Sequence, residues 1–290
     1  MTRPALSAFF ICIVFWSSAQ PRHVSLGVFT GLTAPYTWDE GIYNDSRYKA
    51  RYEVKFSPVG IAYGIDYEGF GFIATPSLIT IGQNYNVINT VGGHEGVRKI
   101  TMKYLHIPLA LKLHVIDLAF FKVSLVAGAG VGYLLNGRET VSHQAAKYRF
   151  PAAVYPILPE SYAIEYDGVL APKVNGLQML EKKDFNSFQI FGSFGFRSDW
   201  DITEAWRVSF DMRANYGVLE TRTDTYLSRV EQNQTLYDYP GKRREIFAHL
   251  NIGISRYIEV DKEKERKTKS FKKFKPQKTS PIRSPRKQRG

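Results

Sequence analysis

The sequence predicts an all-β protein: an eight-stranded, antiparallel, up-and-down transmembrane β-barrel followed by a disordered basic C-terminal tail. Three observations lead to this prediction. Long segments alternate between apolar and polar residues with a period of two, the pattern of strands with one apolar face. These segments have about 11–15 residues, against about five or six in soluble sheets. The links between them alternate between short and long, as in barrels of the outer membrane.

The chain begins with the features of a secretory signal. A cationic start precedes an apolar run over residues 4–16, and small residues at Ser17 and Ala19 suit cleavage after Ala19. The run is too short to span a membrane as a helix, and a buried N-terminal helix is the alternative. We expect three parts: a signal peptide over 1–19, the barrel over 20–259 and the tail over 260–290.

Cysteine and charge narrow the classes of function. The single cysteine, Cys12, lies in the signal, which leaves the exported chain without disulfides or a Cys–metal site. The net charge of +12 is concentrated in residues 261–290, where 13 Lys and Arg face three acidic residues. The barrel region is nearly neutral, so the basic pI does not indicate that this region binds nucleic acid. We expect no nucleic-acid partner.

The first four predicted strands cover about 22–32, 53–67, 70–81 and 99–114. The first alternates Val24, Leu26 and Val28 with small residues. The second alternates aliphatic or tyrosine residues with Gly, Ala and Asp, and the third alternates less clearly. The fourth ends in YLHIPLALKLH, in which each odd position from Leu105 to Leu113 is Leu or Ile.

The last four predicted strands cover about 121–135, 186–197, 206–218 and 244–258. Their apolar faces look outward, as strand 121–135 indicates: an inward apolar face would leave Gly128, Gly130 and Gly132 in a row on the surface, where glycine weakens a strand. In the narrow interior of an eight-stranded barrel small residues fit well. Side chains on the polar faces would then pair with one another inside the barrel. These residues are Asp66, Lys112, Arg207, Asp211, Arg213 and His249.

The links sort by length. Short ones are expected at 68–69, 115–120 and 198–205, and long ones at 33–52, 82–98, 136–185 and 219–242. With an even number of strands, the short turns and both termini are expected in the periplasm and the long loops outside. Aromatic residues flank the short turns and predict an interfacial girdle: Tyr67, Phe70, Phe120, Phe121, Trp200 and Trp206.

The segments YLHIPLALKLH and FKVSLVAGAGVGYLL, and the last strand HLNIGISRYI, resemble the PorT-like outer-membrane β-barrel family of Bacteroidota. The resemblance covers about residues 20–258. It implies the barrel architecture, and one branch of the family is implicated in type IX secretion and gliding motility. The basic tail departs from the family pattern, because such barrels usually stop at the last strand.

No catalytic or metal site is predicted, and no cofactor. His94 and His143 lie in loops without a partner at a recognisable spacing, and His106, His114 and His249 fall on interior faces, where a hydrogen-bonded histidine is the ordinary outcome. The expectation is therefore a protein that is not an enzyme. A wide pore is also excluded, because eight strands leave little open lumen.

The link 136–185 is the candidate partner-binding loop. It is rich in Tyr, Pro and aliphatic residues, and an exposed apolar loop of this kind suggests a docking surface. The alternative, a loop that folds over and plugs its own barrel, stays open. The candidate contact residues are Tyr148, Phe150, Tyr155, Tyr162 and Tyr166.

The tail is predicted to be disordered, because it lacks apolar periodicity and carries several Pro and Ser. In the periplasm its anionic targets would be peptidoglycan, inner-leaflet headgroups or acidic faces of a protein complex, which makes it a candidate electrostatic tether. A solvated tail without a partner is the alternative. The candidate tether residues are Lys272, Lys273, Lys275, Arg283, Arg286 and Lys287.

The sequence thus predicts a non-enzymatic outer-membrane barrel that acts as an accessory or anchoring subunit of a cell-envelope assembly, with a type IX-like secretion role as one version. The alternative is a stand-alone structural or surface-adhesion barrel that binds ligands through its long external loops. An outer-membrane hydrolase has less support. The expected partners are the lipid bilayer of the outer membrane and an envelope complex or peptidoglycan.

Overall fold

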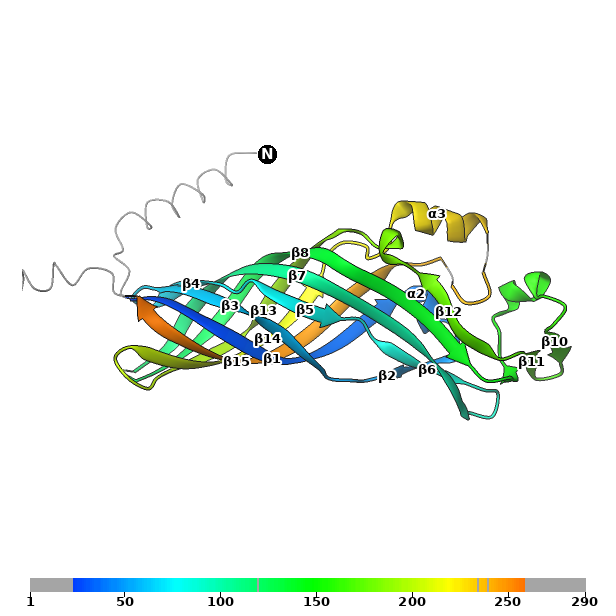
Figure 1. Cartoon of the computed structure of the whole chain (residues 1–290), viewed down its shortest axis with the longest axis horizontal. Helices are drawn as coiled ribbons and strands as arrows, with labels where there is room; N and C mark the ends of the chain where they lie inside the picture. Colours follow the sequence, from blue (N-terminus) through cyan, green and yellow to red (C-terminus); the bar gives the residue numbers. More distant parts are fainter. Residues whose placement is uncertain (1–22, 119, 234, 239, 259–290) are drawn as a thin grey trace, which may run out of the picture. The chain divides into compact units, whose positions relative to one another are not determined.

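The computed structural model describes residues 23–258 except 119, 234 and 239, and this part is built almost entirely of antiparallel strands (Figure 1). The predicted signal peptide and basic tail lie outside the described residues. The long wall is made of β1 (His23–Asp39), β3 (Lys55–Asp66), β4 (Phe70–Ala74), β5 (Ser77–Ile81), β7 (His94–Asp117), β8 (Phe121–His143), β13 (Phe188–Asp201), β14 (Trp206–Gly217) and β15 (Arg243–Ile258).

Shorter elements occupy the long links. The strands are β2 (Tyr48–Arg51), β6 (Asn84–Ile88), β9 (Ala146–Tyr148), β10 (Ala163–Glu165), β11 (Gly168–Ala171) and β12 (Val174–Leu180). The helices are α2 (Glu40–Tyr43), α3 (Asp224–Gln232) and two 3₁₀ turns, η1 (Ala152–Ile157) and η2 (Lys182–Asp184). All of these gather beyond one end of the wall, the loop end, whereas the short turns define the turn end (Figure 1).

The wall strands form part of a 12-stranded sheet with the order β12-β8-β13-β14-β15-β1-β3-β4-β7-β6-β2, in which β5 pairs with β3 and β7, and β7 also pairs with β8. Eight strands were predicted, and that count is not confirmed. Predicted strand 70–81 is divided into β4 and β5 around Thr75 and Pro76; proline has no N–H to donate to a ladder. Strands β2, β6 and β12 join the sheet beside the loop ends of β7 and β8.

Two strands are much longer than predicted. β7 has 24 residues and β8 has 23, and they pair from Gly96 and His143 down to Asp117 and Lys122. Their loop-end halves extend beyond the apolar part of the wall, so the predicted link 136–185 starts only after His143. These extensions were missed because their outward residues are polar or charged and do not continue the apolar alternation of the wall.

The outward direction of the apolar face is confirmed. In β7, Leu109 is 65 % exposed, whereas Tyr104, His106 and Lys112 on the opposite face are buried. The same alternation runs along β1, β13, β14 and β15. The outward apolar residues form a belt that ends at the loop side near Leu105; polar interiors of this kind behind an apolar outer face are typical of barrels in lipid.

Aromatic residues gather at the turn end of the belt, although Tyr67 is buried, and their role as an interfacial girdle stays a prediction. The rings of Tyr67 and Phe70 stack with centroids 4.9 Å apart, and those of Phe121 and Trp200 lie 4.3 Å apart. Within the described residues, no helix combines the length and the apolar character needed to cross a membrane.

Candidate functional site: the filled interior and the loop end

A network of ion pairs fills the barrel interior near the turn end. Asp66 of β3 pairs with Lys112 of β7, and its second oxygen accepts a hydrogen bond of 2.7 Å from Arg207 Nη1 of β14. Arg197 of β13 donates from Nε to Asp199 at 2.9 Å. Because these carboxylates and cations, which come from β3, β7, β13 and β14, face each other across the interior, their buried charges are compensated. We call this set the turn-end network: Asp66, Lys112, Arg197, Asp199, Arg207 and Asp211.

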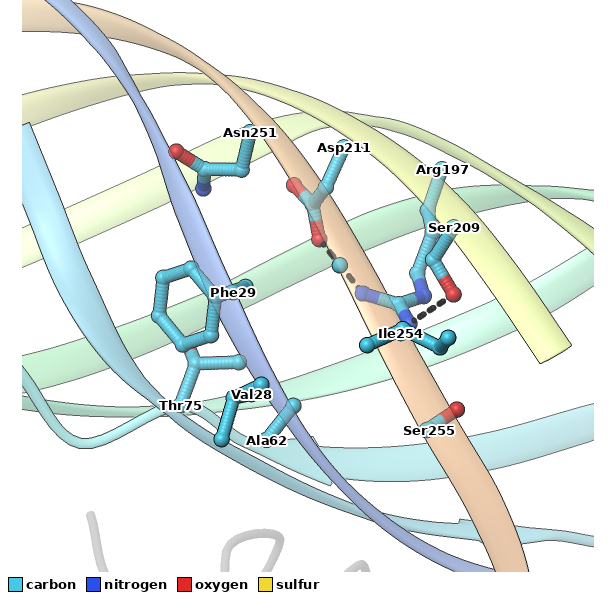
Figure 2. A pocket seen from close by; sticks show the side chains of 11 residues that line it. Val28, Phe29, Ala62, Thr75, Arg197, Ser209, Asp211, Asn251, Ile254 and Ser255 are labelled. Carbon is cyan, nitrogen blue, oxygen red and sulfur yellow. Dashed lines mark hydrogen bonds and ion pairs between the residues drawn. The ribbon is translucent and has the colours of Figure 1, made fainter. Parts of the chain in front are cut away.

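A water-sized cavity lies beside this network. A cavity of about 10 Å³ lies between Phe29, Asn251 and the groups that Arg197 contacts, as Figure 2 shows. Arg197 crosses its edge to Asp211 at 3.1 Å and to Ser209 at 2.7 Å. A volume of this size holds about one water molecule. The interior at this level therefore offers no passage to a solute.

The histidines predicted to face the interior do so, and His106 and His249 belong to a packed layer. His106 lies edge-on to Phe191, with ring centroids 5.2 Å apart, and to Phe247 at 6.2 Å. The Nδ1 atom of His249 lies 3.2 Å from the Nδ2 atom of Asn215. Gly130 is required here, because a Cβ atom at this position would lie 2.7 Å from His106 Nε2.

One serine–histidine pair resembles catalytic geometry. His114 Nδ1 lies 2.8 Å from Ser124 Oγ, and its Nε2 lies 3.8 Å from Asp66 Oδ1. Ser124 is fully buried and Asp66 is held by Lys112 and Arg207, so a substrate cannot reach the hydroxyl and the carboxylate is already paired. Across the described residues, no group of three or more His, Cys, Asp or Glu side chains is placed to hold a metal ion.

A second network closes the interior at the loop end. Glu139 of β8 accepts from Arg98 Nε at 2.5 Å and from Arg243 Nη1 at 2.6 Å. Arg243 also pairs with Asp39 at the end of β1. Asp238, from the link between β14 and β15, lies 3.4 Å from Arg98. We call this set the loop-end network: Asp39, Arg98, Glu139, Arg222, Asp238 and Arg243, all of which are buried.

The link after β8 folds into a small unit of its own. Strands β9, β10 and β11 form a three-stranded sheet. Val154 and Val169 pack with aromatic side chains of the link in a separate apolar cluster. The guanidinium of Arg47, from the link after β1, lies 4.0 Å from the Phe150 ring centroid, a cation–π contact that joins the two links.

A chain of hydrogen bonds ties this unit to the barrel. His143 Nε2 lies 2.9 Å from Tyr237 Oη, which lies 2.9 Å from Tyr162 Oη, while His143 Nδ1 donates to the Gln144 carbonyl. Burial, together with the Arg47 charge, lowers the pKa of His143 below its usual 6.5. Burial and the bond to Tyr162 raise the pKa of Tyr237. Both groups are therefore neutral at physiological pH.

The structure places the five candidate contact residues of the loop in different surroundings. Tyr148 and Phe150 are buried in the core of the loop unit, and Tyr155 and Tyr162 pack against it. Tyr166 alone of the five is fully exposed. Four of the five thus form or contact the apolar core of the loop unit. The role of the loop in docking a partner remains a prediction. The six candidate tether residues lie outside the described part of the chain.

A cleft in the wall at the loop end was not predicted. β1 pairs with β3 only as far as Thr33, so from Ala34 to Asp39 one edge of β1 has no neighbouring strand. Side chains partly cover this edge: Gln83 Oε1 accepts from Thr37 N at 3.1 Å, and Tyr85 Oη donates to the Thr37 carbonyl at 2.8 Å.

The cleft has a volume of about 310 Å³ and an aromatic lining. Tyr43 and Tyr52 are 81 % and 77 % exposed, and the buried Nε2 atom of Gln83 has no hydrogen-bond partner among the described residues. The signal in the sequence is the density of aromatics in the link 33–52, for which alternation predicts only a loop. The aromatic lining residues are Tyr36, Trp38, Tyr43, Tyr48, Tyr52 and Tyr85.

Three solved structures are similar in outline. OprG of Pseudomonas aeruginosa matches 83 % of this chain and 98 % of its own, with 10 % identity and a TM-score of 0.39. The protease OmpT of Escherichia coli matches 83 % and 98 %, with 10 % identity and a TM-score of 0.37. Ail, the attachment invasion locus protein of Yersinia pestis, matches 81 % and 99 %, with 9 % identity and a TM-score of 0.32.

No curated protein sequence matches the chain. A family model does, over residues 16–221, and its description is outer membrane protein beta-barrel domain. This match agrees with the apolar outer belt, the polar interior and the sorted links, and it assigns the protein to the outer membrane. The chain belongs to the outer membrane beta-barrel domain family.

Proposed function

We propose that this protein is a non-enzymatic outer-membrane barrel that binds a carbohydrate chain at the aromatic cleft of its loop end. The wall would be a closed up-and-down barrel in which β4 and β5 count as one of eight strands. The loop end would face outward and the short turns and both termini the periplasm. The observation that carries the proposal is the cleft itself, since a concave space of about 310 Å³ is lined by exposed aromatic side chains.

The chemistry of the cleft suits a sugar. Binding sites for small ligands are concave, largely apolar or aromatic, and contain a few placed polar groups. Exposed tyrosine and tryptophan faces in the cleft can cover the C–H face of a sugar ring. The filled interior supports binding rather than transport, because the turn-end network and the aromatic layer occupy the lumen.

A glycan array probed with the detergent-solubilised full chain tests this function. We expect Trp38→Ala and Tyr52→Ala each to weaken the strongest glycan signal about tenfold, because exposed aromatic anchors carry much of the binding energy. Tyr166→Ala is the matched control, an exposed tyrosine away from the cleft. Heat-modifiable gel mobility shows that each variant is folded. Absence of any glycan signal, or a loss confined to Tyr166→Ala, would contradict the proposal.

A second candidate role is that of an accessory or anchoring subunit of an envelope assembly, as the PorT-like resemblance implies. The observation that favours it is the excess of 13 Lys and Arg over three acidic residues in 261–290. A mild-detergent pull-down that compares the full chain with one ending at Val260 tests it. Partners that are lost on truncation would support a tether, and identical recovery from both forms would contradict it.

A further inference from the structure

Four cations gather on the outer wall of the barrel, on the side away from the interior. Lys99 and Lys103 lie on β7 and Arg138 on β8, and all three side chains are on the outward face. Lys182 of η2 approaches the same wall, with its Nζ atom 5.9 Å from the Tyr133 ring centroid. We call Lys99, Lys103, Arg138 and Lys182 the outer-wall basic patch.

The register places the strand cations close together. Arg138 lies opposite Thr101, midway between Lys99 and Lys103 on the neighbouring strand. Diagonal neighbours of this kind are about 7–8 Å apart, within reach of long side chains. Their direct cross-strand partners are uncharged: Lys99 faces Thr140 and Lys103 faces Asn136.

No ion pair joins any of the four cations to a carboxylate within the described part of the chain. Two carboxylates are adjacent to patch residues in sequence. Glu139, next to Arg138, points to the interior and is held by Arg98 and Arg243, and Glu181, next to Lys182, pairs with Lys183 at 3.3 Å. Neighbouring like charges repel one another, so this arrangement favours an external anion. In the two interior networks, by contrast, every cation faces a carboxylate.

The patch begins at the edge of the apolar belt. Leu105, Tyr133 and Leu135 are outward and exposed. Lys103 lies on β7 only two residues from Leu105, on the side of the loop end. At about 3.3 Å per residue along a tilted strand, Lys103 and Arg138 stand roughly 5–10 Å beyond the belt. The headgroup layer on each side of a bilayer is about 5–7 Å thick, so these cations lie at the depth of lipid headgroups.

From this geometry we infer that the outer-wall basic patch binds the phosphate group of an anionic lipid headgroup in the leaflet around the loop end. The guanidinium of Arg138 can bind two phosphate oxygens, and the lysines add charge-assisted hydrogen bonds. The acyl chains would lie along Leu105 and Leu135.

The test uses the full chain in phosphatidylcholine nanodiscs that contain either bisphosphorylated lipid A or its dephosphorylated form. Native mass spectrometry counts the lipid A molecules that remain bound after release into mild detergent. We expect the natural sequence to retain the bisphosphorylated form at least about tenfold better. The triple variant K99Q/K103Q/R138Q should lose this preference.

A matched control carries the same change of charge elsewhere at the loop end: Arg149→Gln, Lys173→Gln and Lys242→Gln, all exposed. This control should keep the preference, and gel mobility shows whether both variants are folded. Inorganic phosphate added as a competitor should not displace the lipid. Equal retention of both lipid A forms by the natural sequence, retention by the patch variant, loss in the control, or displacement by inorganic phosphate would each overturn the inference.

Discussion

The turn-end network and the loop-end network both bury cations against carboxylates, but they are assembled from different parts of the chain. Every member of the turn-end network lies on a wall strand, where the register fixes its position. In the loop-end network, Arg222 and Asp238 come from the link between β14 and β15. The first network therefore fills the barrel, whereas the second fastens the loops to it.

This difference predicts that a substitution in the turn-end network destabilises the whole barrel, whereas a substitution in the loop-end network loosens only the loops. Asp66→Asn should lower the free energy of unfolding most, by about 3–5 kcal/mol, because the buried Lys112 loses its close carboxylate and keeps only Asp199 at 3.9 Å, whereas Arg207 still pairs with Asp201. Urea titration of gel mobility in detergent measures it. Lys183→Gln is the control: it removes an exposed pair with Glu181 and should cost about 0–1 kcal/mol. Equal effects in the two variants would remove the distinction between buried and exposed pairs.

Glu139→Gln tests the loop end. The loss of one charge should cost about 2–3 kcal/mol locally, less than at Asp66, because Arg98 keeps Asp238 and Arg243 keeps Asp39. We expect limited proteolysis to cut the link 218–242 faster while the wall stays resistant, because Arg222 and Asp238 hold this link in the network. Glu165→Gln removes an exposed pair with Lys147 and should leave the cleavage rate unchanged. Global unfolding of the Glu139 variant would show that the two networks form one unit.

A substitution in the aromatic layer between the two networks should lower the free energy of unfolding by a smaller amount. Gly130→Ala should destabilise the barrel by about 1–2 kcal/mol, because the new methyl group meets His106 Nε2 at 2.7 Å and Pro108 Cα at 2.8 Å. At Gly192 no atom lies within 4 Å of an added Cβ, so Gly192→Ala should change stability by less than about 0.5 kcal/mol. The urea midpoint distinguishes them, and matching midpoints would contradict the tight packing at Gly130.

The smallest expected effect is a pH dependence confined to the loop unit. The pKa of His143 is lowered in the folded protein, so its contribution to stability is complete above about 6.5 and decreases as the pH falls from there towards the folded pKa. Protonation also removes the acceptor for Tyr237. Proteolysis of the link 144–187 should therefore accelerate between pH 7.5 and 5, estimated from the ordinary histidine range.

Two variants isolate the histidine responsible. His143→Asn should flatten this pH dependence, because it removes the titrating group from the hydrogen-bond chain. His94→Gln should preserve it, since His94 is exposed. A pH profile that survives in His143→Asn would assign the effect to another group.

Alternation with a period of two was enough to predict the outward apolar face, the polar interior and the barrel class, because side-chain direction in a strand depends only on position parity. Residues such as Leu109 and Lys112 were placed correctly on that basis. The lengths of β7 and β8 were underestimated, since their loop-end halves lie beyond the apolar belt and carry charge on the outward face. The division at Pro76 and the added strands β2, β6 and β12 were missed for related reasons, because short strands leave little periodicity to detect.

The sequence by itself thus determined the class of the protein and which face of each strand meets lipid. Only the tertiary structure decided which charges pair, since Asp66 meets Arg207 across 141 positions and Asp39 meets Arg243 across 204. It also decided that four of the five loop aromatics pack as a core and that the aromatics of residues 36–52 line a cleft instead. The alternation of side chains between the two faces of a strand is a local property of the chain. Ion-pair partners and clefts depend instead on how distant strands are brought into register.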